Sequence, residues 1–372
     1  MRIRHLDPQN PADVRQWVEF PFQLYKGNAQ WVPNLVSDDK EKFDKSKHPF
    51  YEHSEADFFV VESDGSTLGR VTALENRNFN AYQNRKAAFF GYIEFVDDPA
   101  VSSLLLETVE KWAASRGLQE VIGPRGLAGV DGSTLVKGFE YRPALTIPYN
   151  YPYYDAHIKA GGYEEYGNYL SGYANLKTHV WPERVRRIAE KVKVRRGFRI
   201  KRFQSKREMR EWVPRAMQTL NEAMGHLHTF FPPTPAEVDR IVGALTLIAN
   251  PRLIKLIMKD DEIAGFVVSY PDVSAGLQKA RGRLWPLGWF HLLLDLRRTK
   301  WVNVNGLGLL PKYQGLGANA MLYTEMYDTV KSMDFEHADL AQVNVTNFRS
   351  RSDMESLGAD WYKHHRHYRK DI

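Results

Sequence analysis

The stretch that decides the fold of this chain is Leu307-Gly-Leu-Leu-Pro-Lys-Tyr-Gln-Gly-Leu-Gly-Ala-Asn-Ala-Met-Leu322. It starts inside an apolar run, residues 301–310, that reads as a strand and stops before Pro311, because proline cannot donate to a sheet ladder. Gly315 and Gly317 then predict a tight turn, and Ala318 opens a helix with apolar residues at helical spacing. Such a turn collects bare backbone N–H groups at a helix N-terminus, which favours an anion. An ordinary strand-to-helix turn stays open as the alternative.

Residues 311–318 resemble the pyrophosphate loop of the GNAT superfamily, the acyl-CoA-dependent N-acyltransferases. The family pattern Gln/Arg-x-x-Gly-x-Gly/Ala is met by Gln314 and Gly317, with Asn319 at its last place. A second family pattern, Val-x-x-x-Asn followed by Ala, Tyr and Gly, is matched in kind at four of five places, with Met354 where the tyrosine would stand; its positions are Val343, Asn347, Ser350, Met354 and Gly358. The resemblance covers the chain from residue 198 to its end.

This resemblance implies that acetyl-CoA or another acyl-CoA is the cosubstrate, and it implies no metal. The backbone of residues 307–309 would pair with the pantetheine arm, the N–H groups of residues 314–319 would take the pyrophosphate, and Asn347 would contact the arm from the other side of the opened sheet. The assigned residues are Leu307, Leu309, Leu310, Gln314, Gly315, Leu316, Gly317, Ala318, Asn319 and Asn347.

Amide formation from a thioester requires a base for the amine and an acid for the thiolate. Because Met354 has no proton to give, Tyr323, Tyr327 or Tyr362 would have to supply it. The strand before the loop offers Asn303 and Asn305, neither of which can take a proton, so His226 and His228 are the candidate bases because histidine titrates near neutrality. Each histidine also has a structural interpretation as a turn or cap residue.

The order of elements recurs in the two halves of the chain. Residues 58–74 and residues 252–270 each predict a β-hairpin, and Gly69 of the first hairpin corresponds to Gly265 of the second. A strand, a helix and a strand follow in both halves. The expected fold is therefore α/β, with two tandem GNAT-like domains, each a mixed, mostly antiparallel sheet flanked by helices. The expected boundaries are 1–175, a basic helical linker 176–197, and 198–372. Residues 96–103 replace the phosphate loop of the first copy with a glycine-free acidic stretch, so we expect that copy not to bind CoA.

Composition limits the other possibilities. The chain has 372 residues, no cysteine, a formal charge of +6 and 43% hydrophobic residues, typical of a globular protein without disulfides. No signal peptide or membrane-spanning run is visible, so we expect a cytoplasmic protein. The positive charge suits coenzyme A phosphates or nucleic acid equally. The final run Lys363-His-His-Arg-His-Tyr-Arg-Lys370 is better explained by strand alternation than by metal binding.

Three further segments stand out. Residues 183–215 carry fourteen Lys/Arg against four Asp/Glu, which indicates either a solvated basic face or a footprint for tRNA or an acidic membrane. Residues 123–173 hold nine of the 19 tyrosines and predict either a ligand-lining loop or a well-packed surface. Residues 271–300 insert an apolar helix, with Trp289, Leu292, Leu293 and Leu296 on one face. We expect this helix to be buried in an interface; a lid over an acyl group and membrane docking are the alternatives.

The sequence favours an acyl-CoA-dependent N-acyltransferase acting on a small-molecule or peptide amine. A non-catalytic acyl-CoA-binding or regulatory protein and a tRNA-dependent aminoacyltransferase remain alternatives. The acceptor, the acyl length and the choice between monomer and homodimer stay open.

Overall fold

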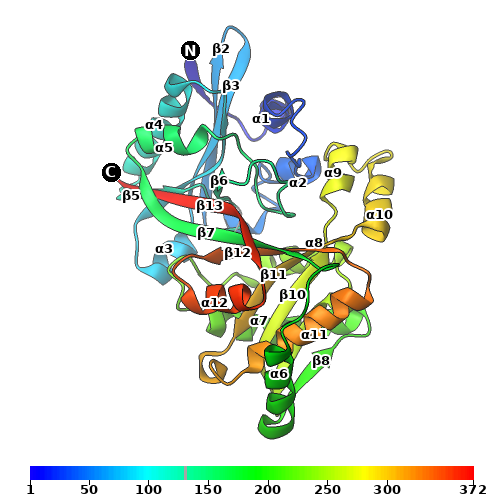
Figure 1. Ribbon diagram of the computed structural model, residues 1–372. Coiled ribbons are helices and arrows are strands. Elements are labelled where there is room, and N and C mark those ends of the chain that lie inside the picture. The colour runs from blue at the N-terminus through cyan, green and yellow to red at the C-terminus, as the bar shows by residue number, and fades with distance from the viewer. Residues whose placement is uncertain (130–131) are drawn as a thin grey trace. The chain divides into compact units, whose positions relative to one another are not determined.

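The computed structural model describes residues 1–129 and 132–372 and divides into two compact units (Figure 1). Unit 1 contains residues 1–170, 274–295 and 363–372, and unit 2 contains residues 171–273 and 296–362. Each unit is a mixed sheet with helices on its faces, which confirms the expected fold class. Val130 and Asp131, inside the tyrosine-rich segment 123–173, lie outside the described residues.

This division departs from the expected boundaries 1–175, 176–197 and 198–372. The last ten residues return to unit 1, because the end of β13 (Asp360–Asp371) pairs with β5 (Glu120–Gly123). The expected linker helix is α6 (Glu183–Arg196), and its residues Ala189 and Val192 are buried in the core of unit 2. It is therefore part of a domain, since its apolar stripe packs against α11 (Ala318–Ser332).

Unit 1 is built on an ordered row of strands. The strand order is β1 (Arg2–His5), β2 (Glu55–Ser63), β3 (Ser66–Glu75), β4 (Ala87–Phe95), β5 and β13. The short strand β6 (Thr134–Lys137) also pairs with β13. Adjacent strands are antiparallel except β4 and β5, which are parallel. One face of the sheet packs on α4 (Pro99–Ala114) and α5 (Tyr154–Ala160). The other packs on α1 (Pro11–Leu24) through Trp17, against Phe58 and Val60. The remaining helices are α2 (Val36–Glu41), α3 (Arg77–Gln83) and the short η1 (Pro49–Glu52).

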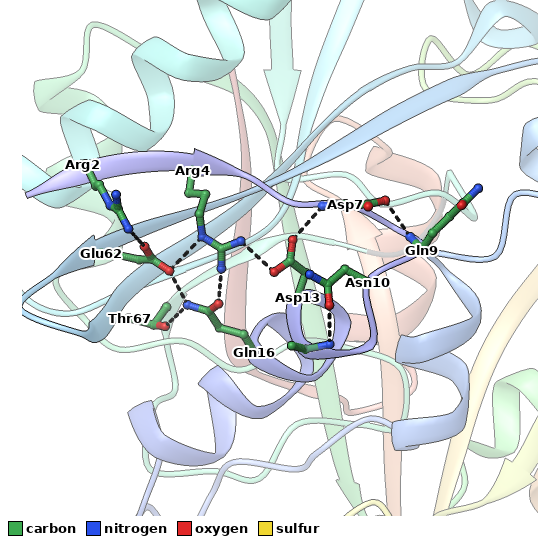
Figure 2. Close-up of polar contacts among 10 residues, drawn as sticks. Arg2, Arg4, Asp7, Gln9, Asn10, Asp13, Gln16, Glu62 and Thr67 are labelled. Carbon is green, nitrogen blue, oxygen red and sulfur yellow. Dashed lines mark hydrogen bonds and ion pairs between the residues drawn. The ribbon is translucent and has the colours of Figure 1, made fainter.

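A network of hydrogen bonds and ion pairs connects the N-terminal strand of unit 1, β1, to β2 and α1 (Figure 2). Arg4 donates from Nε to Glu62 at 3.0 Å and from Nη1 to Asp13 at 2.7 Å, joining β1, β2 and α1. Gln16 adds a donor to Glu62 at 2.7 Å. The hydrogen bond from Gln16, together with the charge of Arg4, holds the pKa of Glu62 below its ordinary value. This network therefore joins the first strand, the second strand and the first helix of unit 1.

Unit 2 repeats the plan. Its strands run in the order β12 (His337–Asn344), β11 (Trp301–Leu309), β10 (Glu262–Pro271), β9 (Ile254–Lys259) and β8 (Phe198–Arg202), next to the end of β7 (Glu164–Asn175). Helices α6 and α11 cover one face, and α7 (Lys206–Met224) covers the other. The unit also contains α8 (Pro235–Ile248), α12 (Phe348–Ser356), η2 (Pro251–Leu253) and η3 (Pro311–Tyr313). The expected hairpins are confirmed as β2–β3 and β9–β10.

The two sheets share a specific irregularity. In unit 2, Val267 pairs with Leu307 and Ser269 with Val304, so β11 carries one extra residue at Asn305–Gly306. In unit 1, Arg70 pairs with Glu94 and Thr72 with Gly91, so β4 bulges at Tyr92–Ile93. Such bulges re-aim a strand beside a functional site. The bulges recur on corresponding strands, one residue apart when Gly69 and Gly265 are aligned, which supports the internal duplication.

The inserted segment forms α9 (Ser274–Ala280) and α10 (Gly288–Arg298), and its residues up to Asp295 belong to unit 1. Gln278 donates to the backbone of Ala29 and Trp31, both at 2.9 Å, and Arg283 contacts Glu19 at 2.5 Å. The segment therefore packs on the N-terminal part of unit 1. The expected burial of the helix is wrong for its outer face, since Trp289 and Leu293 are exposed.

Candidate functional site

The loop between β11 and α11 has the geometry of an anion site. Gly315 and Gly317 take positive φ angles of 74° and 81°, which turn the chain sharply into the helix. Within the described parts of the chain, no acceptor receives the backbone N–H groups of five successive residues; these are Gly315, Leu316, Gly317, Ala318 and Asn319. Unpaired N–H groups at a helix N-terminus are the arrangement that binds phosphate.

Two guanidinium groups flank this loop, and the sequence analysis assigned neither. Arg196, at the end of α6, donates to the carbonyl of Leu316 at 3.1 Å, and Arg349 of α12 donates to the Gln314 side chain at 2.9 Å. Both arginines are exposed, so their charge adds to the field of the loop. Arg196 lies in the basic run that the sequence did reveal.

The loop also packs closely against α6. A Cβ atom added to Gly317 would lie 2.9 Å from Val192 and 3.0 Å from Ile188. Gly317 is therefore required by packing as well as by its φ angle, and its replacement would disturb the loop whatever charge it carried. Gly315 has nothing within 4 Å of an added Cβ and is the better position for testing ligand binding.

The strand that leads into the loop has a free edge. β11 and β12 pair in parallel from Trp301–His337 to Val304–Leu340, while both strands continue beyond this register and separate. The backbone N–H of Leu310 donates to the carbonyl of Ala264 at the start of β10. Because backbone groups alternate in direction along a strand, the N–H and C=O of the preceding residue, Leu309, point away from β10. Gln314 donates to the Leu309 carbonyl at 3.3 Å. This open edge can pair with an extended ligand.

The same edge is closed in unit 1. There, Phe95 is the counterpart of Leu309, because Phe95 pairs with Gly69 as Leu309 pairs with Gly265. The N–H of Phe95 donates to the Tyr154 hydroxyl at 3.1 Å, and the Tyr153 hydroxyl donates to the Phe95 carbonyl at 2.6 Å. Part of the tyrosine-rich segment thus fills the strand edge of the first copy. This packing is in line with the expectation that unit 1 does not bind CoA.

Several residues assigned from the family pattern have structural partners. The Asn319 side chain donates to Asp353 at 2.6 Å, and the Tyr323 hydroxyl donates to the same carboxylate at 3.1 Å. Burial and the charge of Asp353 raise the pKa of Tyr323 well above its ordinary value. The Asn347 side chain caps α12 by accepting the N–H of Ser350. Asn319, Tyr323 and Asp353 therefore tie the start of α11 to α12 beside the loop, whereas Asn347 only caps α12.

Tyr327 and Tyr362 lie in different surroundings. The Tyr327 hydroxyl donates to the carbonyl of His179 at 3.1 Å, and its ring stacks on Trp181. Tyr362 instead donates to the Asp339 carboxylate at 2.5 Å, and burial followed by the charge of Asp339 raises its pKa above the ordinary range. Tyr362 is therefore held beside a carboxylate, whereas Tyr327 packs against the segment preceding α6.

Asp339 is a candidate that the sequence analysis missed. It is 3% exposed and pairs in register with Asn303, one residue before β11 and β12 separate. Asn303 is 1% exposed, and neither atom of its amide has a hydrogen-bond partner among the described residues. An unsatisfied buried amide costs stability, so it indicates a functional position. A search of β12 for acidic side chains on the face of Asn303 would have found Asp339.

His226 and His228, the candidate bases, follow the end of α7, and both are exposed. The methyl group of Met224, at the end of α7, would lie 3.2 Å from a Cβ atom added to Gly308. The helix therefore ends over β11 close to its open edge. The chain places both histidines just beyond this point.

Comparison with known folds defines the class of protein. A tandem GNAT protein from the clavulanic acid biosynthesis pathway aligns over 100% of this chain and 98% of its own, with a TM-score of 0.59 and 10% identity. A GCN5-related N-acetyltransferase from Sphaerobacter thermophilus aligns over 99% and 95%, with a TM-score of 0.53 and 14% identity. The chain therefore has the tandem GNAT fold, which confirms the resemblance seen in the sequence.

Two curated relatives match nearly the whole chain, although no protein-family model matches it. The "Bacterial ceramide synthase" of Caulobacter vibrioides (strain NA1000 / CB15N) is 26% identical over 98% of this chain and 96% of its own length. The "Protein YghO" of Escherichia coli (strain K12) is 24% identical over 98% and 94%. Among the described helices, none combines the length and apolar character needed to cross a membrane.

Proposed function

We propose that this protein is an acyl-CoA-dependent N-acyltransferase whose reaction takes place in unit 2. The observation that carries the proposal is the row of five N–H groups at the start of α11, which have no acceptor among the described residues and lie next to the open edge of β11. The first feature suits a pyrophosphate and the second an amide-containing arm. Arg196 and Arg349 add positive charge on either side of the loop.

An acyl-CoA, when bound, supplies a thioester whose C–S bond breaks as the acceptor nitrogen bonds to the carbonyl carbon. The amine must lose a proton, and the thiolate must gain one. Asp339 is a buried carboxylate one residue before the strands separate, so we assign it the role of the base that accepts the amine proton. The Tyr362 hydroxyl, which donates to it, would fix its orientation. Asn303 can donate from its amide to the acceptor. Tyr323 is a candidate acid for the thiolate. Its hydroxyl and the Asn319 side chain of the loop both donate to the Asp353 carboxylate, so the hydroxyl is held close to the loop.

The acceptor that we propose is a long-chain primary amine. A ceramide is the amide of a fatty acid with a long-chain amino alcohol, and the relative bearing the name of a ceramide synthase aligns over 98% of this chain. Such an acceptor falls within the wider class of small-molecule amines expected from the sequence. The donor would then be a long-chain acyl-CoA.

The test is a direct assay of the full chain. Palmitoyl-CoA and a sphingoid base are incubated with the protein, thiol release is followed, and the amide is identified by mass spectrometry. We expect both products in equal amounts. Binding of CoA without turnover would support a non-catalytic acyl-CoA-binding protein, and absence of CoA binding by calorimetry would overturn the proposal. Turnover with short amines alone would retain the reaction type and reject the lipid acceptor.

A further inference from the structure

The outer face of the α9–α10 insertion is the most concentrated apolar surface of the described chain. Fourteen large apolar side chains are exposed in residues 1–129 and 132–372, and five of them fall between residues 285 and 293. Their exposed fractions range from 45% to 81%, and they are Trp285, Leu287, Trp289, Phe290 and Leu293. We call these five residues the apolar face. A surface of this kind marks an interaction site.

The opposite side of α10 is fixed in place. A Cβ atom added to Gly276 would lie 3.0 Å from the Asp295 side chain and 3.0 Å from the His291 backbone, so α9 and α10 are in close contact. The Gly276 N–H donates to Asp295 at 2.7 Å. Figure 1 shows these two helices side by side in yellow. The apolar face is therefore held outward by packing and does not fold back onto α9.

The charge around this face is of one sign. Residues 274–298 contain five Lys/Arg and one acidic residue, Asp295, which is engaged by Gly276. Arg283 is paired with Glu19. The other four cations are exposed and have no ion pair within the described residues; they are Lys279, Arg281, Arg297 and Arg298. Arg297 follows Leu293 by one helical turn, so it lies on the side of the apolar face.

We propose that the apolar face docks on an anionic lipid surface. Two tryptophans and apolar neighbours suit the boundary between headgroups and acyl chains, and a helix with one apolar face lies in that plane. The unpaired cations suit anionic headgroups. A second copy of the chain fits less well, because a twofold contact through this face would oppose like charges without carboxylates. This inference does not rest on the proposed acyl transfer.

The experiment is sedimentation of the full chain with vesicles. At 100 mM salt we expect binding to vesicles with 30% phosphatidylglycerol and at least tenfold weaker binding to pure phosphatidylcholine. Replacement of Trp285, Trp289 and Phe290 by serine should weaken binding at least tenfold. The matched control replaces three exposed apolar residues of unit 2 by serine, Val180, Val194 and Leu247, and should bind within twofold of wild type.

The double variant Lys279→Glu/Arg297→Glu leaves the apolar side chains intact and should remove the preference for anionic vesicles. It keeps the proposal testable if the serine variant fails to fold. Wild-type protein that does not sediment with the anionic vesicles would overturn the proposal, as would a serine variant that binds equally well. A dimer in sedimentation velocity that only the serine variant dissociates would replace the lipid surface by a second copy.

Discussion

Phe95 in unit 1 and Leu309 in unit 2 hold the same place in their sheets, yet only Phe95 has both outward backbone groups covered by tyrosine hydroxyls. Each lies two or three residues after the strand bulge and opposite a glycine of the preceding hairpin. In unit 1, side chains of the unit itself cover the strand edge that is left open in unit 2. This difference is the basis for proposing ligand binding in unit 2 and not in unit 1.

Replacing Tyr154 by phenylalanine should destabilise unit 1 without affecting CoA binding. The Tyr154 hydroxyl is buried and accepts the Phe95 N–H, so its loss leaves a buried donor unpaired, at a cost of about 1–3 kcal/mol. Urea denaturation measures the change, and calorimetry measures CoA affinity. The control Tyr82→Phe, on an exposed side chain, should change stability by less than about 0.5 kcal/mol. An unchanged stability in Tyr154→Phe would show that the hydroxyl does not close the edge.

A carboxylate placed at Gly315 should abolish CoA binding by repelling the pyrophosphate. Gly315 has a φ of 74° and open space around it, and both aspartate and asparagine tolerate this conformation. Gly315→Asp and Gly315→Asn therefore differ mainly by one charge. Calorimetry should show at least a tenfold loss of affinity in the first relative to the second. Equal affinities would mean that the phosphates do not lie on this loop.

Asp339→Asn should reduce the turnover number more than the affinity for acyl-CoA. A general base contributes about 10²–10⁴-fold to rate, and asparagine keeps the shape while losing the ability to take a proton. Tyr362→Phe, which removes only the partner hydroxyl, should have a smaller effect and shift the pH profile. Steady-state kinetics separates kcat from KM for both. A full kcat in Asp339→Asn would exclude it as the base.

His226 and His228 provide the competing assignment of the base. If either histidine takes the amine proton, its replacement by alanine should lower kcat and remove an acidic limb from the pH–rate profile. Because both side chains are exposed and Asp339 is buried at the strand separation, we expect changes of less than threefold. A hundredfold loss in either variant would reverse this assignment. The double variant guards against substitution of one histidine by the other.

His365 should make the folded protein sensitive to mild acid. Burial lowers its pKa to about 3, and its Nε2 has no hydrogen-bond partner among the described residues. Between pH 6.5 and about 3 the unfolded chain binds a proton that the folded one rejects, so stability rises with pH and falls on acidification. His365→Asn should reduce this slope by about 1.4 kcal/mol per pH unit. Urea titrations of the wild type and the variant at pH 4, 5 and 6 measure the slope, and equal slopes would contradict the prediction.

The sequence by itself determined the α/β class, the duplicated order of elements and the position of the glycine turn between β11 and α11. These features depend on local signals: the strand stop at Pro311, the two glycines, and the helical spacing after Ala318. The hairpins were found for the same reason, because period-two alternation and short turns are read from neighbouring residues. The basic run also pointed to Arg196, although not to its contact with the loop.

The tertiary structure alone decided which residues meet across the sheet. Asp339 is brought beside Asn303 by the parallel pairing of β11 and β12, whose strands are joined through a whole helix, so the sequence offers Asp339 as a candidate but only the sheet register sets the contact. The end of the chain joins unit 1 because β13 completes that sheet through β5, a pairing between segments about 250 residues apart. Tyr153 and Tyr154 cover Phe95 for the same reason: closure depends on long-range packing, whereas the loop is set by its own backbone.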